Sequence, residues 1–191
     1  MCATIAAQAC LPILNLGLDY YRGWHTLLIY PTAFVAHRET RDEDGIVHTG
    51  YEELDGESAE GGPLVLSWDE AQPQPADATY NVVVHEFAHK LDELTGAPNG
   101  LPPLHKDMSI DAWARAMTAA YDAFNDLLDR DVEPPFDDYA GSDPAEFFAV
   151  TSELFFAAPD VVIDVYPDVY AQLKLFYRQD PIAAYEPIDA H

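Results

Sequence analysis

The chain has 191 residues, 49% of them hydrophobic, and its 34 Asp and Glu residues against 9 Lys and Arg give a net charge of −25. This length and apolar content are sufficient for one domain with a core of its own. A charge of this sign and size repels nucleic-acid phosphates and anionic lipids, so the composition argues against direct nucleic-acid binding and against a membrane-associated protein.

The first predicted element is an apolar run over residues 5–18, which polar residues, a proline and a glycine interrupt. The run is too short and too broken for a membrane span, and it lacks the basic start of a signal peptide. We therefore expect a buried helix and a cytoplasmic protein. The two cysteines, Cys2 and Cys10, are too few for a disulfide framework and are expected to be free thiols.

Two short apolar runs follow. Residues 24–31 resemble a buried strand that a proline ends, and residues 64–68 form a second strand. Between them, residues 34–50 are polar and charged, with a turn signal at Asp44-Gly45.

The motif His85-Glu86-Phe87-Ala88-His89 is the most informative part of the chain. Residues four apart lie on one face of a helix, so His85 and His89 can bind a single cation. Glu86 follows the first histidine, where it can reach water bound to that cation. This is the H-E-x-x-H arrangement of zinc peptidases, in which zinc lowers the pKa of bound water towards ~7. The motif predicts a zinc site with Glu86 as general base.

The sequence around the motif predicts one helix over residues 77–95. Asp77 or Thr79 would cap its start, and Gly96 would end it in the left-handed conformation. The alternative is that both histidines merely lie on a half-buried helix. Apolar packing alone would not place a glutamate between two correctly spaced imidazoles, so the metal site is favoured.

Asp92 is the acidic residue nearest to the motif in sequence. It lies about 4.5 Å beyond His89 along the helix axis, so its short side chain is poorly placed to bind the same ion. We expect its carboxylate to accept a hydrogen bond from an imidazole N–H and so fix the tautomer. The alternative is a solvated aspartate at the helix end. A metzincin-type third histidine is excluded, because Thr95 occupies that position.

Further elements follow at helical spacing. Residues 111–128 predict a scaffold helix, residues 131–141 form a Pro-rich loop that contains Tyr139, and residues 169–177 predict a final helix closed by Pro181.

Between that loop and the final helix, Asp143 and Pro144 begin another predicted helix, which Pro159 stops. Glu146 and Glu153 are seven residues apart and share one face of it. Glu146 also fits an Asp-x-x-Glu capping box. Glu153 lies in an aromatic stretch, where a buried carboxylate is costly unless it is paired or bound to a metal. One of the two is expected to bind the metal and the other to support it; the spacing does not choose between them.

Four separated segments, residues 6–12, 62–68, 81–92 and 139–146, together resemble the Mlc titration factor A family (MtfA) in the same order. Its members are zinc-dependent peptidases with a zincin-type catalytic domain, and the resemblance covers nearly the whole chain. Such proteins usually begin with further helical sequence, whereas this chain starts inside a segment that resembles the family. We therefore expect the usual N-terminal portion to be missing.

The resemblance implies a zinc ion bound by His85, His89 and Glu146, with Glu86 as general base. It also implies that Tyr139 is a phenol near the site that stabilises the developing oxyanion. Glu146 is 57 positions after His89, a long spacing that makes the site gluzincin-like.

The resemblance leaves Asp92 and Glu153 in supporting roles. The expected fold class is α+β, a zincin-like metallopeptidase domain in which a small mixed sheet packs against the H-E-x-x-H helix and the C-terminal half is mainly helical. We expect one catalytic domain over residues 1–191, with a helix and strands over 1–76 and the helical part with the zinc site over 77–191. In zincins the strand before the metal helix is often the sheet edge on which a peptide substrate pairs. Residues 63–68 are the candidate, with an ordinary core strand as the alternative.

The predicted function is that of a zinc-dependent, aminopeptidase-like peptidase with one zinc per chain and peptide substrates. The alternative, implied by the family name, is a regulatory protein that sequesters a transcriptional repressor, with peptidase activity secondary or absent. An intact Glu86 favours catalysis, because a structural zinc needs no base. A third possibility is an inactive relic, since the short start could leave the domain unstable.

Overall fold

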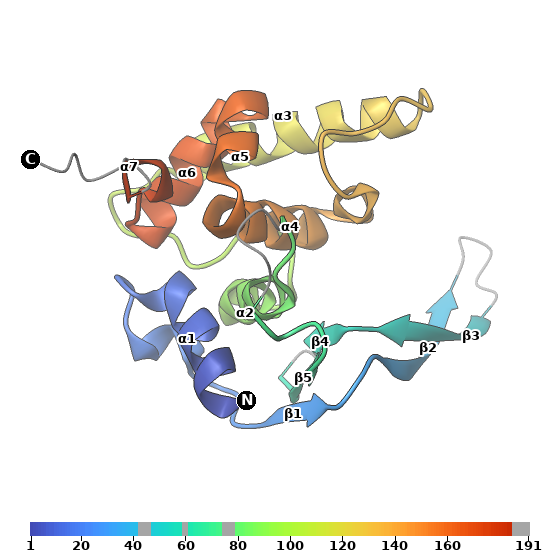
Figure 1. Ribbon diagram of the computed structural model, residues 1–191. Helices are drawn as coiled ribbons and strands as arrows, with labels where there is room; N and C mark the ends of the chain where they lie inside the picture. Colours follow the sequence, from blue (N-terminus) through green and yellow to red (C-terminus); the bar gives the residue numbers. More distant parts are fainter. Residues whose placement is uncertain (42–46, 59–60, 74–78, 185–191) are drawn as a thin grey trace, which may run out of the picture.

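A computed structural model describes residues 1–41, 47–58, 61–73 and 79–184 of the chain. It has the predicted α+β class: a small sheet and the first helix lie below a central helix, and the other long helices lie above it (Figure 1). The elements are, in chain order, α1 (Cys2–Ile13), β1 (Leu27–Tyr30), β2 (Phe34–Arg41), β3 (Val47–Leu54), β4 (Gly56–Ser58), β5 (Leu64–Ser67), α2 (Val82–Asp92), α3 (Ile110–Leu128), α4 (Pro144–Ala157), α5 (Pro159–Val165), α6 (Pro167–Tyr177) and α7 (Pro181–Ala184), with 3₁₀ turns η1 (Leu18–Tyr21), η2 (Glu93–Thr95) and η3 (Asp138–Gly141).

The three-stranded sheet is mixed and has the order β1-β5-β4. The central strand β5 pairs in parallel with β1 and antiparallel with β4. All four residues of β5 are buried, whereas Leu28 and Tyr30 of β1 are 41% and 48% exposed. The prediction that residues 63–68 form the substrate-binding edge is therefore wrong, because both edges of that strand are already paired. The prediction of a buried strand over residues 24–31 is also wrong in part, since β1 is an edge strand with two exposed side chains.

Strands β2 and β3 form a separate antiparallel hairpin that projects from the body of the protein (Figure 1). Its register runs from Phe34 opposite Leu54 to Arg41 opposite Val47. The sequence did not predict these strands, because their polar composition lacks an apolar face. The turn signal at Asp44-Gly45 lies outside the described residues.

Helix α2 is the centre of the molecule, and every one of its residues is buried. It packs against α4 on one side and against α1 and β4 on the other (Figure 1). Ala88 and Leu91 belong to the apolar cluster of the helical layer, while Val83 and Phe87 belong to the smaller cluster over the sheet. A helix that is buried all round needs partners for its polar side chains, and three of those of α2, His85, Glu86 and His89, line the site described below.

The start of α2 differs from the prediction. Asn81 is the N-cap, and its side-chain oxygen accepts a hydrogen bond from the backbone N–H of Val84 at 3.1 Å. The helix therefore begins at Val82, not near Thr79, while Asp77 lies outside the described residues. At the other end, Gly96 has a positive φ of 126° but an extended ψ of −149°, so it is not in the left-handed helical conformation.

Helix α1 also ends earlier than predicted. Ile5, Ala9 and Ile13 are buried, whereas Leu14 and Leu18 are 66% and 79% exposed. The expectation of a buried helix up to residue 18 is therefore wrong beyond Ile13. In the described part of the chain, no helix combines the length and apolar content needed to cross a bilayer.

Helices α3, α4 and α6 follow the prediction, but α5 was not predicted, and α6 is not the final helix: it ends at Tyr177, and Pro181 begins α7. Ser109 caps α3, and the Asp143 carboxylate accepts hydrogen bonds from the backbone N–H groups of Ala145 and Glu146 at 2.8 and 3.0 Å. Pro144 occupies the first turn of α4. The aromatic core between α3, α4 and α6 contains Trp113, Phe124, Phe147, Phe148 and Phe176. This packing fixes the position of α4 relative to α2, and with it the position of the site.

Candidate metal centre

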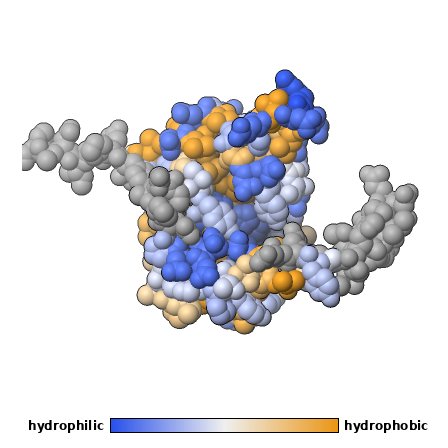
Figure 2. Space-filling model, turned by 45° about the vertical axis from the view of Figure 1, so that its right-hand side comes forward, coloured by the Kyte–Doolittle hydropathy of each residue, from blue (hydrophilic) through white to orange (hydrophobic). Residues whose placement is uncertain are grey.

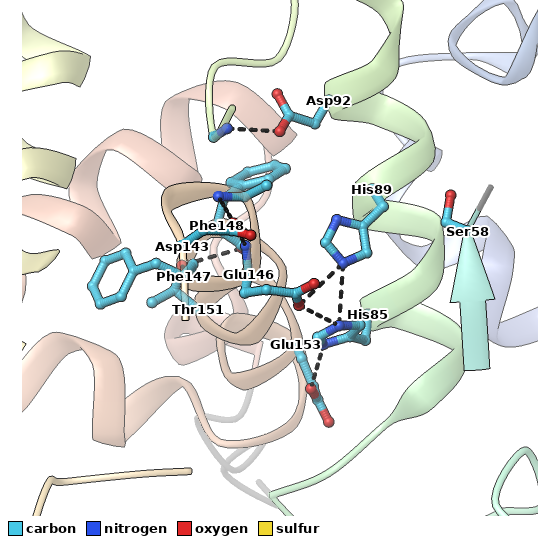
Figure 3. Close-up of polar contacts among 12 residues, drawn as sticks. Ser58, His85, His89, Asp92, Asp143, Glu146, Phe147, Phe148, Thr151 and Glu153 are labelled. Carbon is cyan, nitrogen blue, oxygen red and sulfur yellow. Dashed lines mark hydrogen bonds and ion pairs between the residues drawn. The ribbon is translucent and has the colours of Figure 1, made fainter. Parts of the chain in front are cut away.

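Three side chains from two helices meet in one cluster. Glu146 Oε2 of α4 lies 3.1 Å from His85 Nε2 and 3.3 Å from His89 Nε2 of α2. The two imidazole Nε2 atoms are 3.3 Å apart (Figure 3). The structure thus brings together the three residues for which the sequence resemblance implied metal binding.

The shape of this cluster suits zinc. Two ligands of a tetrahedral ion with bonds of about 2.0–2.1 Å are separated by about 3.3–3.4 Å. The three interatomic distances match this value closely, and two neutral imidazoles with one carboxylate form a common donor set for zinc. The residues present therefore fit the ion.

Helix α4 presents its two acidic side chains to opposite nitrogens of His85. Glu146 contacts Nε2, while Glu153 Oε2 lies 3.4 Å from Nδ1 (Figure 3). Glu153 also accepts a hydrogen bond from the backbone N–H of Asn81, the N-cap of α2. Glu153 is thus placed to hold the imidazole in the tautomer that leaves Nε2 free for a metal. Of the two carboxylates between which the spacing did not choose, Glu146 lies beside the nitrogens that His85 and His89 turn towards each other, and Glu153 lies beside the other nitrogen of His85.

The ionisation of the cluster follows from these contacts. Burial disfavours a charged imidazole, but the hydrogen bonds to Glu146 and Glu153 outweigh it and raise the pKa of His85 to about 10. Burial by itself would raise the pKa of Glu146, yet its hydrogen bonds to the two histidines hold it well below its ordinary value. Without a metal, the cluster is therefore held by a proton that an incoming cation must displace.

Glu86 lies beside the cluster on the same helix, and the backbone of β4 lies against its carboxylate. A Cβ atom at Gly56 would lie 2.4 Å from Glu86 Oε1, so only glycine permits this approach. The other oxygen, Oε2, is buried without a hydrogen-bond partner among the described residues. Burial raises the pKa of Glu86 to about 7, although the two imidazoles lower it. A carboxylate with a pKa near neutrality and an unengaged oxygen is suited to take up a proton.

Asp92 does not make the predicted contact with an imidazole. Its Oδ2 accepts hydrogen bonds from the backbone N–H groups of Asn99 and Gly100 at 2.7 and 2.6 Å, and its Oδ1 has no partner among the described residues. Gly100 packs on the first turn of α4, where a Cβ atom would come within 2.5 Å of the Pro144 carbonyl oxygen. Its own carbonyl accepts a hydrogen bond from Trp113 Nε1 at 2.9 Å. Asp92 thus fixes the loop that supports the start of α4.

The cluster lies at the bottom of a cleft of about 730 Å³ between α2, α4, β4 and η3. Figure 2 shows hydrophilic residues in the band between the helical layer above and the sheet below. Tyr139 of η3 lines the cleft, is 44% exposed, and its ring centroid lies 6.2 Å from that of His85. The structure therefore places the predicted phenol beside the cluster.

Comparison with known proteins agrees with this geometry. Residues 1–178 match the family described as "Glucose-regulated metallo-peptidase M90". The chain belongs to this M90 metallopeptidase family. It is 41% identical over 184 residues to the Mlc titration factor A of Edwardsiella ictaluri (strain 93-146), which covers 94% of this chain and 70% of the relative. It is 39% identical over 193 residues to that of Serratia proteamaculans (strain 568), covering 100% of this chain and 73% of the relative. The resemblance to the Mlc titration factor A family is confirmed.

The M90 site contains two residues that the sequence did not single out. Gly56 shapes the wall against Glu86, but a lone glycine in a polar stretch carries no signal of its own. Tyr80 lines the cleft directly before the N-cap of α2. Burial and the nearby carboxylates of Asp55 and Glu153 raise the pKa of Tyr80 far above its ordinary range, so its phenol keeps its proton. The one sequence feature that pointed to Tyr80 is its position directly before the H-E-x-x-H helix.

Proposed function

We propose that the protein is a zinc-dependent peptidase, gluzincin-like in its ligands and aminopeptidase-like in its action, with one zinc per chain held by His85, His89 and Glu146. The M90 family shows a metallopeptidase, and the choice of zinc rests on the donor set. The observation that carries the proposal is the triangle of Nε2, Nε2 and Oε2 atoms with edges of 3.1–3.3 Å beside the buried Glu86.

When bound, zinc would supply the Lewis acidity that makes water a nucleophile at neutral pH and that polarises the peptide carbonyl. Glu86 takes the proton from the attacking water and delivers it to the leaving amine. Tyr139 donates a hydrogen bond to the oxygen on which negative charge develops. Glu153 keeps the His85 ring in its metal-binding tautomer, and Gly56 keeps the Glu86 carboxylate at its working position.

The peptide itself has a place to bind at β4. Residues Gly56–Ser58 line the cleft, and β4 pairs with β5 in the three-stranded sheet. Ser58 Oγ donates a hydrogen bond to Glu93 at 2.7 Å, and Glu93 forms an ion pair with Lys90, so β4 is held at the C-terminal end of α2. We infer that an extended substrate lies along β4 in the cleft and passes over Glu86.

The test uses the purified chain with and without metal. Chromogenic aminoacyl substrates and longer peptides should be hydrolysed by the zinc-loaded protein, not after chelation, and again after zinc is restored. Equal activity in excess chelator, or no hydrolysis of any peptide by protein with one zinc bound, would contradict the proposal. Comparing free with N-acetylated peptides tests the aminopeptidase-like assignment, which predicts that acetylation abolishes cleavage.

A second candidate function comes from the relatives, whose shared name is Mlc titration factor A. By analogy, the chain would bind a transcriptional repressor, with the metal site as a secondary feature. Binding of the purified repressor that is unaffected by chelation, together with a flat peptidase assay, would favour this candidate. The predicted cytoplasmic location would suit either function.

A further inference from the structure

A second, smaller recess of about 150 Å³ opens beside the metal cluster. Tyr80, His85, Asp137 and Tyr139 line both the recess and the main cleft, so the two adjoin each other. The recess reaches away from the metal ligands between η3, α4 and α5. Its remaining wall is formed mainly by apolar side chains: Pro135, Phe136, Val150, Leu154 and Val161.

The carboxylate of Glu153 lines the recess and already has hydrogen-bond partners within the protein. Glu153 contacts His85 Nδ1 and accepts the Asn81 N–H, so its carboxylate has partners within the protein. The second carboxylate, Asp137, is exposed and accepts a hydrogen bond from the Tyr139 backbone N–H at 2.9 Å. No Lys or Arg is among the described residues that line the recess. An acidic side chain would meet two carboxylates there and no lysine or arginine, so its burial would be costly.

The volume sets the size of the occupant. An apolar cavity of about 150 Å³ is large enough to hold benzene. A leucine, methionine or phenylalanine side chain would therefore fill the recess, alanine would leave most of it empty, and tryptophan would exceed it.

We propose that this recess receives an apolar side chain of the residue next to the scissile bond, and so makes the enzyme selective for leucine, methionine or phenylalanine at one of the two flanking positions. This rests on the proposed peptidase function. The position of the recess beside His85 requires that the selected residue adjoin the cleaved bond, because a more distant side chain could not enter the recess.

Two peptide series test the proposal, each with one flanking position varied among Ala, Leu, Phe, Lys and Asp. In one series Leu and Phe should exceed Ala by roughly 10–100-fold in kcat/KM, with Asp lowest, because each added apolar carbon is bound in the recess. Val161→Phe would fill the recess from α5, and Val161 is only partly buried, so the fold should tolerate the change. In that variant the ratio of kcat/KM for the Leu and Phe substrates to kcat/KM for the Ala substrate should fall towards one.

Val165→Phe is the matched control, because Val165 lies on the same helix, is 40% exposed and does not line the recess. It should keep the wild-type preference. If neither series shows a preference for apolar residues, if Lys is preferred, or if Val161→Phe leaves the preference intact, the proposal is wrong.

A binding measurement separates this proposal from the proposed function. Hydroxamates bind zinc without being hydrolysed, so acetohydroxamate can be compared with hydroxamates that carry an isobutyl or benzyl arm, by calorimetry on the zinc-loaded protein. The isobutyl and benzyl hydroxamates should bind at least about tenfold more tightly than acetohydroxamate, and Val161→Phe should remove this difference in affinity. If binding shows this pattern but no peptide is hydrolysed, the proposal for the recess is supported and the proposed peptidase function is contradicted. Peptide hydrolysis with equal binding of all three compounds would retain the peptidase and reject the recess.

Discussion

The metal cluster and the rim of the cleft are built in different ways. His85, His89 and Glu146 lie on two long helices that pack directly against each other, and the two histidines are only 8% exposed. The rim consists of a three-residue strand and a 3₁₀ turn, and Tyr139 on it is 44% exposed. Rigid helices place groups that must share one ion, whereas short, accessible segments are suited to admitting a substrate. Substitutions in the two regions should therefore separate metal binding from turnover.

The largest expected effect on turnover comes from Glu86→Gln. The amide preserves the volume beside Gly56 but cannot take up a proton, so kcat should fall by roughly 10²–10⁴-fold while zinc content stays at one per chain. Peptide hydrolysis and metal analysis on the same preparation check this. Glu133→Gln, an exposed position in the loop after α3, is the control and should be unchanged. Full activity in Glu86→Gln would contradict its assignment as the base.

Glu146→Gln and Glu153→Gln form a matched pair on α4. Loss of the carboxylate that faces both Nε2 atoms should weaken zinc binding by more than about 10²-fold, whereas loss of the one behind His85 should cost about 10–100-fold. Competition with a fluorescent chelator measures both affinities. The reverse order would make Glu153 the ligand.

Gly56 of the rim lies against Glu86 of α2, so Gly56→Ala tests whether the rim positions the base. The added methyl would displace the Glu86 carboxylate by steric overlap, so kcat should fall by about 10–10²-fold with no change in zinc affinity. Gly50→Ala is the control, because a Cβ atom there meets nothing within 4 Å. Wild-type kcat in Gly56→Ala would show that the strand does not position the base.

The pH dependence of zinc binding follows from the proton held by the metal-free cluster. The hydrogen bonds to Glu146 and Glu153 raise the pKa of His85 to about 10 against the effect of burial, so His85 carries a proton at neutral pH that zinc must displace. Apparent zinc affinity should therefore increase as pH rises, by roughly tenfold per pH unit for each proton released, and level off above a pH of about 10. Affinity that is constant between about pH 6 and pH 8 would contradict this protonation state.

The smallest effect is expected for Tyr139→Phe at the exposed rim. Loss of one hydrogen bond to the developing oxyanion should lower kcat by about tenfold or somewhat more, with zinc affinity and KM little changed. Steady-state kinetics on peptides measure both parameters. A change in KM alone would make Tyr139 a substrate-binding residue.

The same contrast explains what the sequence could predict. His85 and His89 are visible because helical periodicity alone places them together, and Asp143 with Pro144 marks the start of α4. The choice between Glu146 and Glu153 depended on how α4 packs against α2, which spacing does not contain; family resemblance supplied it. Asp92 was expected at an imidazole and instead holds Gly100, because the loop after α2 folds back onto its carboxylate. The contact of Gly56 with Glu86 and the position of β4 in the sheet depend on parts of the chain that are distant in sequence, so the local sequence did not indicate them.

The most direct test is a crystal structure of the zinc-loaded protein with anomalous diffraction recorded at the zinc edge. One anomalous peak should lie about 2.0–2.2 Å from His85 Nε2, His89 Nε2 and Glu146 Oε2, with Glu153 hydrogen-bonded to His85 Nδ1. A peak bound by Glu153 in place of Glu146, or no peak between these side chains in protein that retains zinc, would contradict the metal centre on which the proposed activity depends.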